Sequence, residues 1–182
     1  MEKEIFKQIK KKYGNYASFA IWGKDLNNVN IIEKNVEILH GKIVFVGLNI
    51  SKSINKFQNF HFKHKGGRDN WLKELLNDSF IFKGAYMTDI IKNNISSRQN
   101  KLKMSDKEKE KNLELFEKEL IALNTKPELI AFGNKTYKLL DKIPEKLYKD
   151  RYKVSHYASW IKKNDFFREV KKVENKILSK NK

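Results

Sequence analysis

Three polar residues stand at the ends of short apolar segments that predict β-strands: Asn49, Asp89 and His156. An amide can orient a water molecule, a carboxylate accepts hydrogen bonds, and an imidazole can stabilise negative charge that develops on a leaving group. A fourth segment of this kind ends at Gly133 and Asn134. These residue types could together bind a polar ligand and assist a hydrolysis.

Strands and helices alternate along the chain and must position these residues. The predicted strands cover residues 42–48, 84–91, 128–132 and 152–157, and the predicted helices cover 2–13, 67–76, 105–123, 136–140 and 163–180. Strands separated by helices pair in parallel through right-handed crossovers. We therefore expect an α/β fold in one domain over 1–182. Its architecture would be a three-layer sandwich with a central four-stranded parallel sheet, strand order 2-1-3-4, and helices on both faces.

In such a sheet the carboxyl ends of the strands meet at one edge, and this edge is where ligands bind. Asn49, Asp89, Asn134 and His156 should converge there. The first segment taken alone has a simpler interpretation, because Gly47 permits a sharp turn and Asn is a common turn residue.

The composition limits the functional classes. A chain of 182 residues can bury a core without staples, and it contains no Cys, which excludes disulfides, thiolate metal sites and a Cys nucleophile. No apolar run is long enough to span a membrane, and the charged N-terminal segment has no signal-peptide core. We expect a cytoplasmic protein that does not bind membranes.

The chain is strongly basic, with 39 Lys and Arg against 22 Asp and Glu and a formal net charge of +17. Such a charge attracts polyanions, and it favours nucleic acid as the partner. Most of the excess is Lys, and abundant Lys, Asn and Ile are also typical of proteins from AT-rich genomes. The charge is therefore compatible with DNA or RNA binding and does not establish it. We expect a monomer.

Two further motifs have weaker interpretations. Gly66 and Gly67 lack the following Lys and Ser/Thr of a P-loop, so a nucleoside triphosphate site is not expected. His61, His64 and Asp69 have suitable ligand chemistry but no recognised zinc spacing. The alternative is a basic loop that contacts phosphate or solvent. We expect no metal and no cofactor.

The order of the motifs resembles that of the uracil-DNA glycosylase superfamily. The chain has a strand followed by Gly47-Leu48-Asn49, a strand ending in Thr88-Asp89, the segment Pro-Glu-Leu-Ile-Ala-Phe-Gly-Asn before a helix, and a strand with His156. The first motif is nearest to the mismatch-specific branch, and the resemblance spans residues 40–160. It implies a four-stranded parallel sheet between helices, and DNA as the partner.

The resemblance also implies roles for individual residues. Asn49 would position water against the sugar C1′ without acting as a base, and His156 would stabilise charge on the departing base. A base flipped out of the duplex needs aromatic rings to stack on, and Phe57 and Phe60 are candidates. The cluster of Tyr16, Phe19 and Trp22 is another candidate, or it packs in the core. The implied substrate-binding residues are Gly47, Leu48, Asp89, Phe57, Phe60 and Asn134.

The chain departs from the family pattern at three places. Ile50 replaces the Pro that usually follows the first motif, and Tyr157 follows His156 where the family has Pro. Asp89 stands where the uracil-specific enzymes have an Asn that reads the base. An ionised carboxylate only accepts hydrogen bonds, so it would repel O4 of uracil and favour a base with an exocyclic amine or adjacent N–H groups. Alternatively, Asp89 hydrogen bonds to nearby backbone.

Two hypotheses of different classes result. The first is a glycosylase-like enzyme that hydrolyses the N-glycosidic bond of a modified or mismatched base in DNA. The second is a catalytically inactive protein of the same fold that binds nucleic acid or a nucleotide. A third is phosphodiester hydrolysis by a metal ion held among His61, His64, Asp69 and Asp89.

Overall fold

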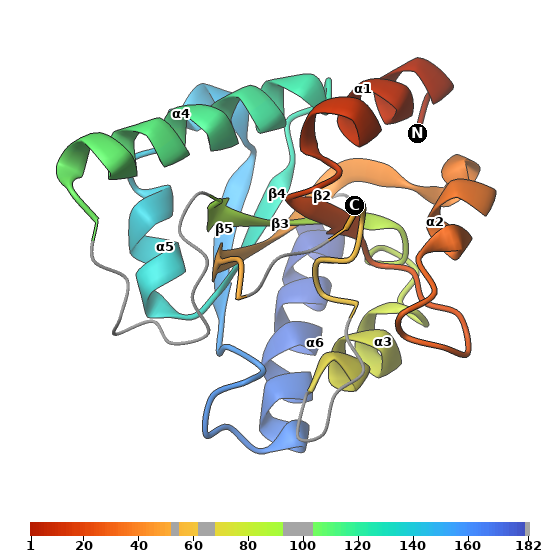
Figure 1. Ribbon diagram of the computed structural model, residues 1–182. Coiled ribbons are helices and arrows are strands. Elements are labelled where there is room, and N and C mark those ends of the chain that lie inside the picture. Colours follow the sequence, from red (N-terminus) through yellow and green to blue (C-terminus); the bar gives the residue numbers. More distant parts are fainter. Residues whose placement is uncertain (52–54, 62–67, 93–103, 181–182) are drawn as a thin grey trace.

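The computed structural model describes residues 1–51, 55–61, 68–92 and 104–180. Its centre is a five-stranded sheet in the order β1-β3-β2-β4-β5 (Figure 1). The strands are β1 (Ala17–Phe19), β2 (His40–Asn49), β3 (Ala85–Ile91), β4 (Glu128–Phe132) and β5 (Asp150–Val154).

The four strands from β2 to β5 pair in parallel, and β1 pairs with β3 in the antiparallel direction. The predicted α/β fold with a parallel sheet is confirmed, and the four predicted strands lie in the order β3-β2-β4-β5. The prediction of a four-stranded sheet was wrong because β1 adds a fifth strand at the edge. A three-residue strand is too short to show the alternation by which strands are recognised.

Helices cover both faces of the sheet (Figure 1). Apolar side chains of α1, α4 and α5 pack on one face, and those of α3 and α6 pack on the other. The helices are α1 (Lys3–Tyr13), α2 (Asn30–Lys34), α3 (Asp69–Leu76), α4 (Asp106–Ala122), α5 (Asn134–Leu140) and α6 (Lys163–Lys180), with short 3-10 turns η1 (Val36–Ile38) and η3 (Glu145–Leu147). Neither α2 nor the 3-10 turns were predicted.

The two faces of the sheet hold separate apolar clusters, because side chains along a strand alternate between the faces. Val44 and Val46 of β2 belong to the cluster under α1 and α4, whereas Phe45 belongs to the cluster under α3 and α6. We call the second side the α3/α6 face.

One predicted strand end shifts in the structure. β3 ends at Ile91 as predicted, with Asp89 inside the strand, whereas β5 ends at Val154, two residues before His156. A capping box begins α4, since Ser105 and Glu108 each accept the other's backbone N–H.

The predicted polar loop 92–104 lies largely outside the described residues. Among the helices that the structure describes, none is both long and apolar enough to cross a membrane.

Candidate functional site

The candidate site starts from the pairing of β2 with β3, which places Gly47 opposite Asp89. The Asp89 side chain lies directly over Gly47: a Cβ atom at position 47 would be 2.0 Å from Asp89 Oδ1 and 3.3 Å from Cζ of Phe60. Only a glycine leaves room for this carboxyl group. Gly47 therefore gives the Asp89 side chain room beside β2. Its sequence context instead predicts that it permits a sharp turn.

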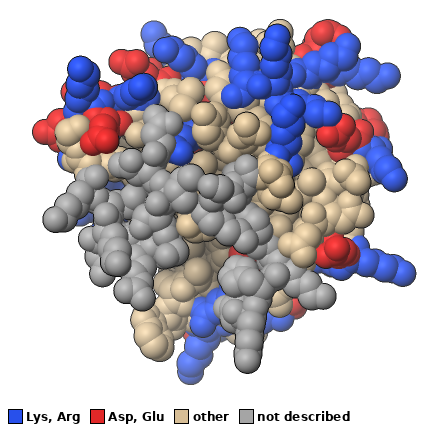
Figure 2. Space-filling model, viewed as in Figure 1, with Lys and Arg blue, Asp and Glu red and all other residues tan. Residues whose placement is uncertain are grey.

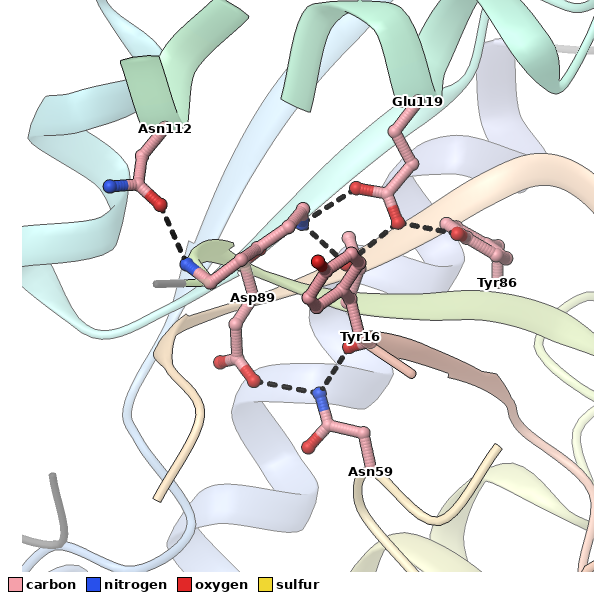
Figure 3. A network of polar contacts seen from close by, with 8 residues as sticks. Tyr16, Asn59, Tyr86, Asp89, Asn112 and Glu119 are labelled. Atoms are coloured by element: carbon pink, nitrogen blue, oxygen red, sulfur yellow. Dashed lines mark hydrogen bonds and ion pairs between the residues drawn. The ribbon is translucent and has the colours of Figure 1, made fainter. Parts of the chain in front are cut away.

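A second contact fixes the orientation of Asp89. The amide of Asn59 donates hydrogen bonds to Asp89 Oδ2 at 2.7 Å and to the carbonyl of Tyr16 at 2.8 Å (Figure 3). Asn59 belongs to the segment 55–61, in which Phe57 and Phe60 both have positive φ values, 60° and 63°. This backbone is rare for bulky side chains, and strained residues of this kind cluster at functional sites.

Burial controls the ionisation of Asp89, which is 4% exposed. Desolvation raises its pKa to about 6, against the opposing effects of the Asn59 hydrogen bond and of nearby Lys92, and the carboxylate of Glu119 raises it further. A carboxyl group with this pKa is half protonated near pH 6. Perturbed carboxyl groups are typical of functional sites, although structural networks also produce them.

Lys92 does not neutralise the Asp89 side chain. Its ammonium group forms a fully buried ion pair with Glu119 at 2.7 Å and donates to Thr88 Oγ1 at 2.9 Å and to the main-chain carbonyl of Asp89. Glu119 also accepts from the hydroxyls of Thr88 and Tyr86 (Figure 3). This network lies between β3 and α4, so Asp89 joins it through its backbone while its carboxyl group faces Gly47.

His156 belongs to the same side of the sheet as Asp89. Its ring lies 6.2 Å from that of Phe132, and the Phe132 ring lies 6.2 Å from that of Phe60, which contacts Gly47. All these rings belong to the α3/α6 face, where Phe60 and Phe132 are core residues.

The structure also defines the protonation of His156. Burial lowers the pKa of the imidazole to about 4, so the ring is neutral at pH 7. The backbone N–H of Ala158 donates to Nδ1 at 3.0 Å. In the neutral ring the proton is therefore on Nε2, which makes Nε2–H a hydrogen-bond donor.

Tyr157, the residue after His156, lies near the carboxyl groups of Asp69 and Asp89. Its hydroxyl hydrogen bonds to Asp69 at the start of α3, and burial together with Asp69 and Asp89 raises its pKa well above the ordinary value. Its ring stacks on that of His156 at 4.8 Å. The buried side chains of Asp69 and Asp89 thus lie close to one phenol.

Asn49 is the last residue of β2 and is partly exposed. The β2–β3 register pairs Asn49 with Ile91 and Gly47 with Asp89, so Asn49 lies beyond the Gly47–Asp89 pair, toward the carboxyl edge of the sheet. Its amide donates to the carbonyl of Ile50 at 3.1 Å. Asn49, Asp89 and His156 therefore all lie toward the carboxyl edge of the sheet.

Other predicted site residues lie elsewhere. Leu48 and Phe57 are buried in the core on the opposite face, where the Phe57 ring stacks on that of Phe6 at 5.6 Å. Asn134 is exposed at the first residue of α5. Of the two candidate stacking residues, Phe60 is therefore the one beside Gly47 and Asp89.

The alternative aromatic cluster near the N-terminus packs mainly as core. Phe19 is fully buried, and the Trp22 ring stacks on that of His61 at 4.9 Å. Tyr16 instead contributes its backbone carbonyl to Asn59.

The described residues contain no group of three or more His, Asp or Glu side chains that could hold a metal ion. His61 is buried, its Nε2 lies 3.1 Å from the carbonyl of Phe19, and burial lowers its pKa to about 4. His64 lies outside the described residues, as do Gly66 and Gly67.

Three residues beside the site were not singled out from the sequence: Asn59, Arg68 and Trp160. The guanidinium of Arg68 lies over the ring of Trp71, and its Nη1 donates to the carbonyls of Tyr157, Ser159 and Ile161. The Arg68 guanidinium therefore holds the segment after His156 in place. The same segment carries the fully exposed indole of Trp160. A tryptophan four residues after His156 is the one signal in the sequence that could have identified this segment.

Comparisons with protein-family models and with curated proteins found no match to this sequence. The interpretation of the site therefore depends on its geometry and chemistry.

Proposed function

We propose that this protein is a glycosylase-like hydrolase that cleaves the N-glycosidic bond of a modified or mismatched base in DNA, on a three-layer α/β fold of the uracil-DNA glycosylase type. The main support is the position of Asn49, Asp89 and the neutral imidazole of His156 toward the carboxyl edge of one parallel sheet. Parallel sheets bind their ligands at this edge.

In the proposed reaction the C1′–N bond breaks, a water oxygen bonds to C1′, and the base leaves with the electron pair. The amide of Asn49 would orient the water. The proton that the water loses would pass to solvent, because an amide is not a base. The Nε2–H of His156 would donate a hydrogen bond to the oxygen on which negative charge develops. A neutral donor fixed by the Ala158 N–H suits this role, because it costs little reorganisation during the reaction.

Base recognition would use the Asp89 carboxyl group and the Phe60 ring. Asp89 is oriented by Asn59, and Phe60 lies against the same Gly47. The exposed indole of Trp160 could stack on a neighbouring base, since base–aromatic stacking contributes about 1–3 kcal/mol.

The surface charge is compatible with a DNA partner. Lys and Arg side chains gather over α1 in Figure 2, and exposed Lys11 and Lys12 lie in its last turn. This end of α1 adjoins the Asn59 segment, because Phe57 donates its N–H to the Gly14 carbonyl at 2.7 Å. Phosphates bound there would lie beside the candidate site.

The test is incubation with single-stranded and duplex oligonucleotides that carry a panel of deaminated and mismatched bases, followed by alkaline cleavage at abasic sites. Asn49→Ala and His156→Gln should each lower the rate of base release by about 100-fold, the usual effect of removing one transition-state contact. Lys138→Ala, an exposed change on α5, is the control. If the unaltered protein releases no base from any oligonucleotide, the proposal is overturned.

A second candidate is a catalytically inactive protein that binds nucleic acid. The burial of Asp89 and the lysines at the end of α1 favour it, because phosphate binding does not require an accessible carboxyl group. It predicts DNA affinity that falls steeply with salt concentration in the absence of any base release.

A further inference from the structure

His156 and Tyr157 are consecutive residues whose side chains stack on each other just after β5. Their ring centroids lie 4.8 Å apart, and the ring planes are inclined by 17°. In a strand, consecutive side chains point to opposite faces. The stack therefore depends on the turn in which Ser159 donates its N–H to the His156 carbonyl at 2.9 Å.

The Tyr157 ring is the buried member of the stack, whereas His156 is partly exposed. The rings of Phe132 and Phe166 lie 5.4 Å and 6.3 Å from it. The phenol ring is thus a packed inner surface, against which the more exposed imidazole lies.

The start of α3 holds this turn in two ways. Asp69, the first residue of α3 and itself buried, accepts a hydrogen bond from the Tyr157 hydroxyl. Arg68, the preceding residue, donates to the backbone carbonyls of residues 157, 159 and 161. Arg68 thus acts on the backbone of the turn, and Asp69 acts on the side chain of Tyr157. Because a buried hydroxyl without a partner costs about 1–3 kcal/mol, the second contact restricts the phenol to one orientation.

The hydrogen bond to the imidazole does not by itself fix the plane of the ring. It comes from the backbone N–H of Ala158, an exposed residue, and joins Nδ1 at 3.0 Å. Such a bond fixes the position of one ring atom and still permits the ring to tilt about it. The stacked phenol of Tyr157 restricts this tilt, and so it sets the direction in which Nε2–H points.

We propose that Tyr157 is a positioning residue for His156, and that its hydrogen bond to Asp69 aims the imidazole Nε2–H at the departing base. This inference rests on the proposed glycosylase function, in which His156 donates to the oxygen where negative charge develops. It also gives a role to one departure from the family pattern, since Tyr157 stands where the family has Pro. Proline has no hydroxyl that could reach a carboxylate.

The direction of this donor affects the rate of base release. A fixed donor stabilises the transition state only when it points at the atom on which charge develops. Misplacement by about 1 Å can cost about 100-fold in rate, and removal of the Tyr157 hydroxyl, which leaves the ring in place, should cost less, about tenfold. The affinity for DNA should not change, because Tyr157 and Asp69 are both buried.

The experiment combines single-turnover base release from the oligonucleotides named above with NMR spectra of the His156 imidazole at pH 7. Tyr157→Phe should release base about tenfold more slowly, while its dissociation constant for the same oligonucleotide stays within about twofold. The unaltered protein should show one set of imidazole signals with the proton on Nε2. Tyr157→Phe should show broadened signals or a mixture of both tautomers.

Tyr152→Phe is the matched control. Tyr152 is a buried tyrosine of the α3/α6 face, and its hydroxyl accepts a hydrogen bond from Lys180 at 3.1 Å. The control removes a hydroxyl of the same kind at the opposite end of β5. It should keep both the rate of base release and the imidazole spectrum.

Two substitutions test the part of Asp69. Asp69→Asn keeps an oxygen that can accept from the Tyr157 hydroxyl, so it should retain the rate of the unaltered protein. Asp69→Ala removes the acceptor and should lower the rate as far as Tyr157→Phe does. The double variant of Tyr157→Phe and Asp69→Ala should be no slower than the slower single variant, because both changes remove the same hydrogen bond.

The outcomes separate this inference from the proposed function. A folded Tyr157→Phe protein with the imidazole spectrum of the unaltered protein overturns the inference, and so does a changed spectrum with an unchanged rate. Both results leave the glycosylase function standing. No base release by the unaltered protein overturns the proposed function, and the imidazole spectra then decide alone whether Tyr157 positions His156. Thermal melting establishes which variants are folded, and if Tyr157→Phe is not, the comparison of Asp69→Ala with Asp69→Asn decides in the same way.

Discussion

Gly47 and Asp89 face each other across β2 and β3, and the Asp89 carboxyl group occupies the space that a side chain at position 47 would need. A Cβ there would lie 2.0 Å from Asp89 Oδ1, well inside contact distance. The neighbouring Phe60 ring cannot yield easily because it is packed against Phe132. The lack of a side chain at Gly47, in the first motif, therefore allows the Asp89 carboxyl group to take its place in the candidate site.

Gly47→Ala should lower the free energy of unfolding by about 1–3 kcal/mol, the usual cost of overpacking a core. Urea unfolding measures it. Gly23→Ala is the matched control, since the nearest side-chain atom to a Cβ there is 3.6 Å away, an ordinary contact, and its effect should stay within about 0.5 kcal/mol. Equal stability of the two variants would show that Asp89 does not occupy this space.

Asp89 should make the protein less stable as pH rises. Its folded-state pKa, about 6, lies above its ordinary value of 3.8, so the folded state binds the proton more tightly than the unfolded state. The stabilisation is complete below pH 3.8 and is lost as pH rises through 6. The difference corresponds to about 3 kcal/mol, at 1.36 kcal/mol per pKa unit.

Asp89→Asn removes this dependence. Its free energy of unfolding minus that of the unaltered protein should be about 2–3 kcal/mol higher at pH 7.5 than at pH 4. Urea titrations of both proteins at the two pH values measure this difference. The exposed change Asp78→Asn should show no such dependence, and a pH-independent difference for Asp89→Asn would mean that Asp89 titrates normally.

The sequence predicted the parallel strands well because their apolar runs are continuous, and β4 begins and ends at the predicted residues. It could not predict the environment of Asp89. Asp89 lies inside β3, and its side chain is held by Asn59, which is 30 positions away in the sequence. The role of Asn59 was hidden for the same reason, since both its partners are distant in sequence. Local sequence patterns predict helices, strands and turns. They do not predict which distant loop packs over a strand.

His156 should stay neutral well below its ordinary pKa of 6.5, because burial lowers the pKa to about 4. The folded state then disfavours the proton, so stability is retained above pH 6.5 and is lost as pH falls toward 4. The NMR chemical shifts of the imidazole should show a titration midpoint near pH 4 and a proton on Nε2 at pH 7. A midpoint near 6.5 would instead indicate a solvated ring, of which about a quarter is charged at pH 7.

The Lys92–Glu119 ion pair should show strong coupling because both side chains are completely buried. Lys92→Met leaves Glu119 buried without its cation and should cost about 3–5 kcal/mol. Lys92→Met combined with Glu119→Gln should cost less than the sum of the two single changes, since the amide oxygen can still accept from Tyr86. The exposed Lys7–Glu4 pair is the control cycle, and its coupling should be below about 1 kcal/mol. For each ion pair, urea unfolding of the unaltered protein, the two single variants and the double variant gives the coupling energy. Similar coupling energies for the two pairs would contradict the prediction.

Arg68 should control the order of the segment that carries Trp160. Its Nη1 donates to the Tyr157 and Ile161 carbonyls at 3.3 and 3.2 Å, and also to Ser159. Arg68→Lys keeps the charge but replaces the planar group by a compact ammonium, which cannot reach the same set of carbonyls in one geometry. Backbone amides of residues 157–161 should therefore exchange with solvent faster in Arg68→Lys.

Arg168→Lys is the matched control, because Arg168 lies on α6 and forms an exposed ion pair with Asp165. Hydrogen exchange read by mass spectrometry should show no change at 157–161 in this variant. Base release by Arg68→Lys should fall together with the loss of protection, because the backbone N–H of Ala158 in this segment fixes the His156 tautomer. Unchanged protection in Arg68→Lys would show that the packing of the Tyr157 ring, rather than Arg68, holds this segment in place.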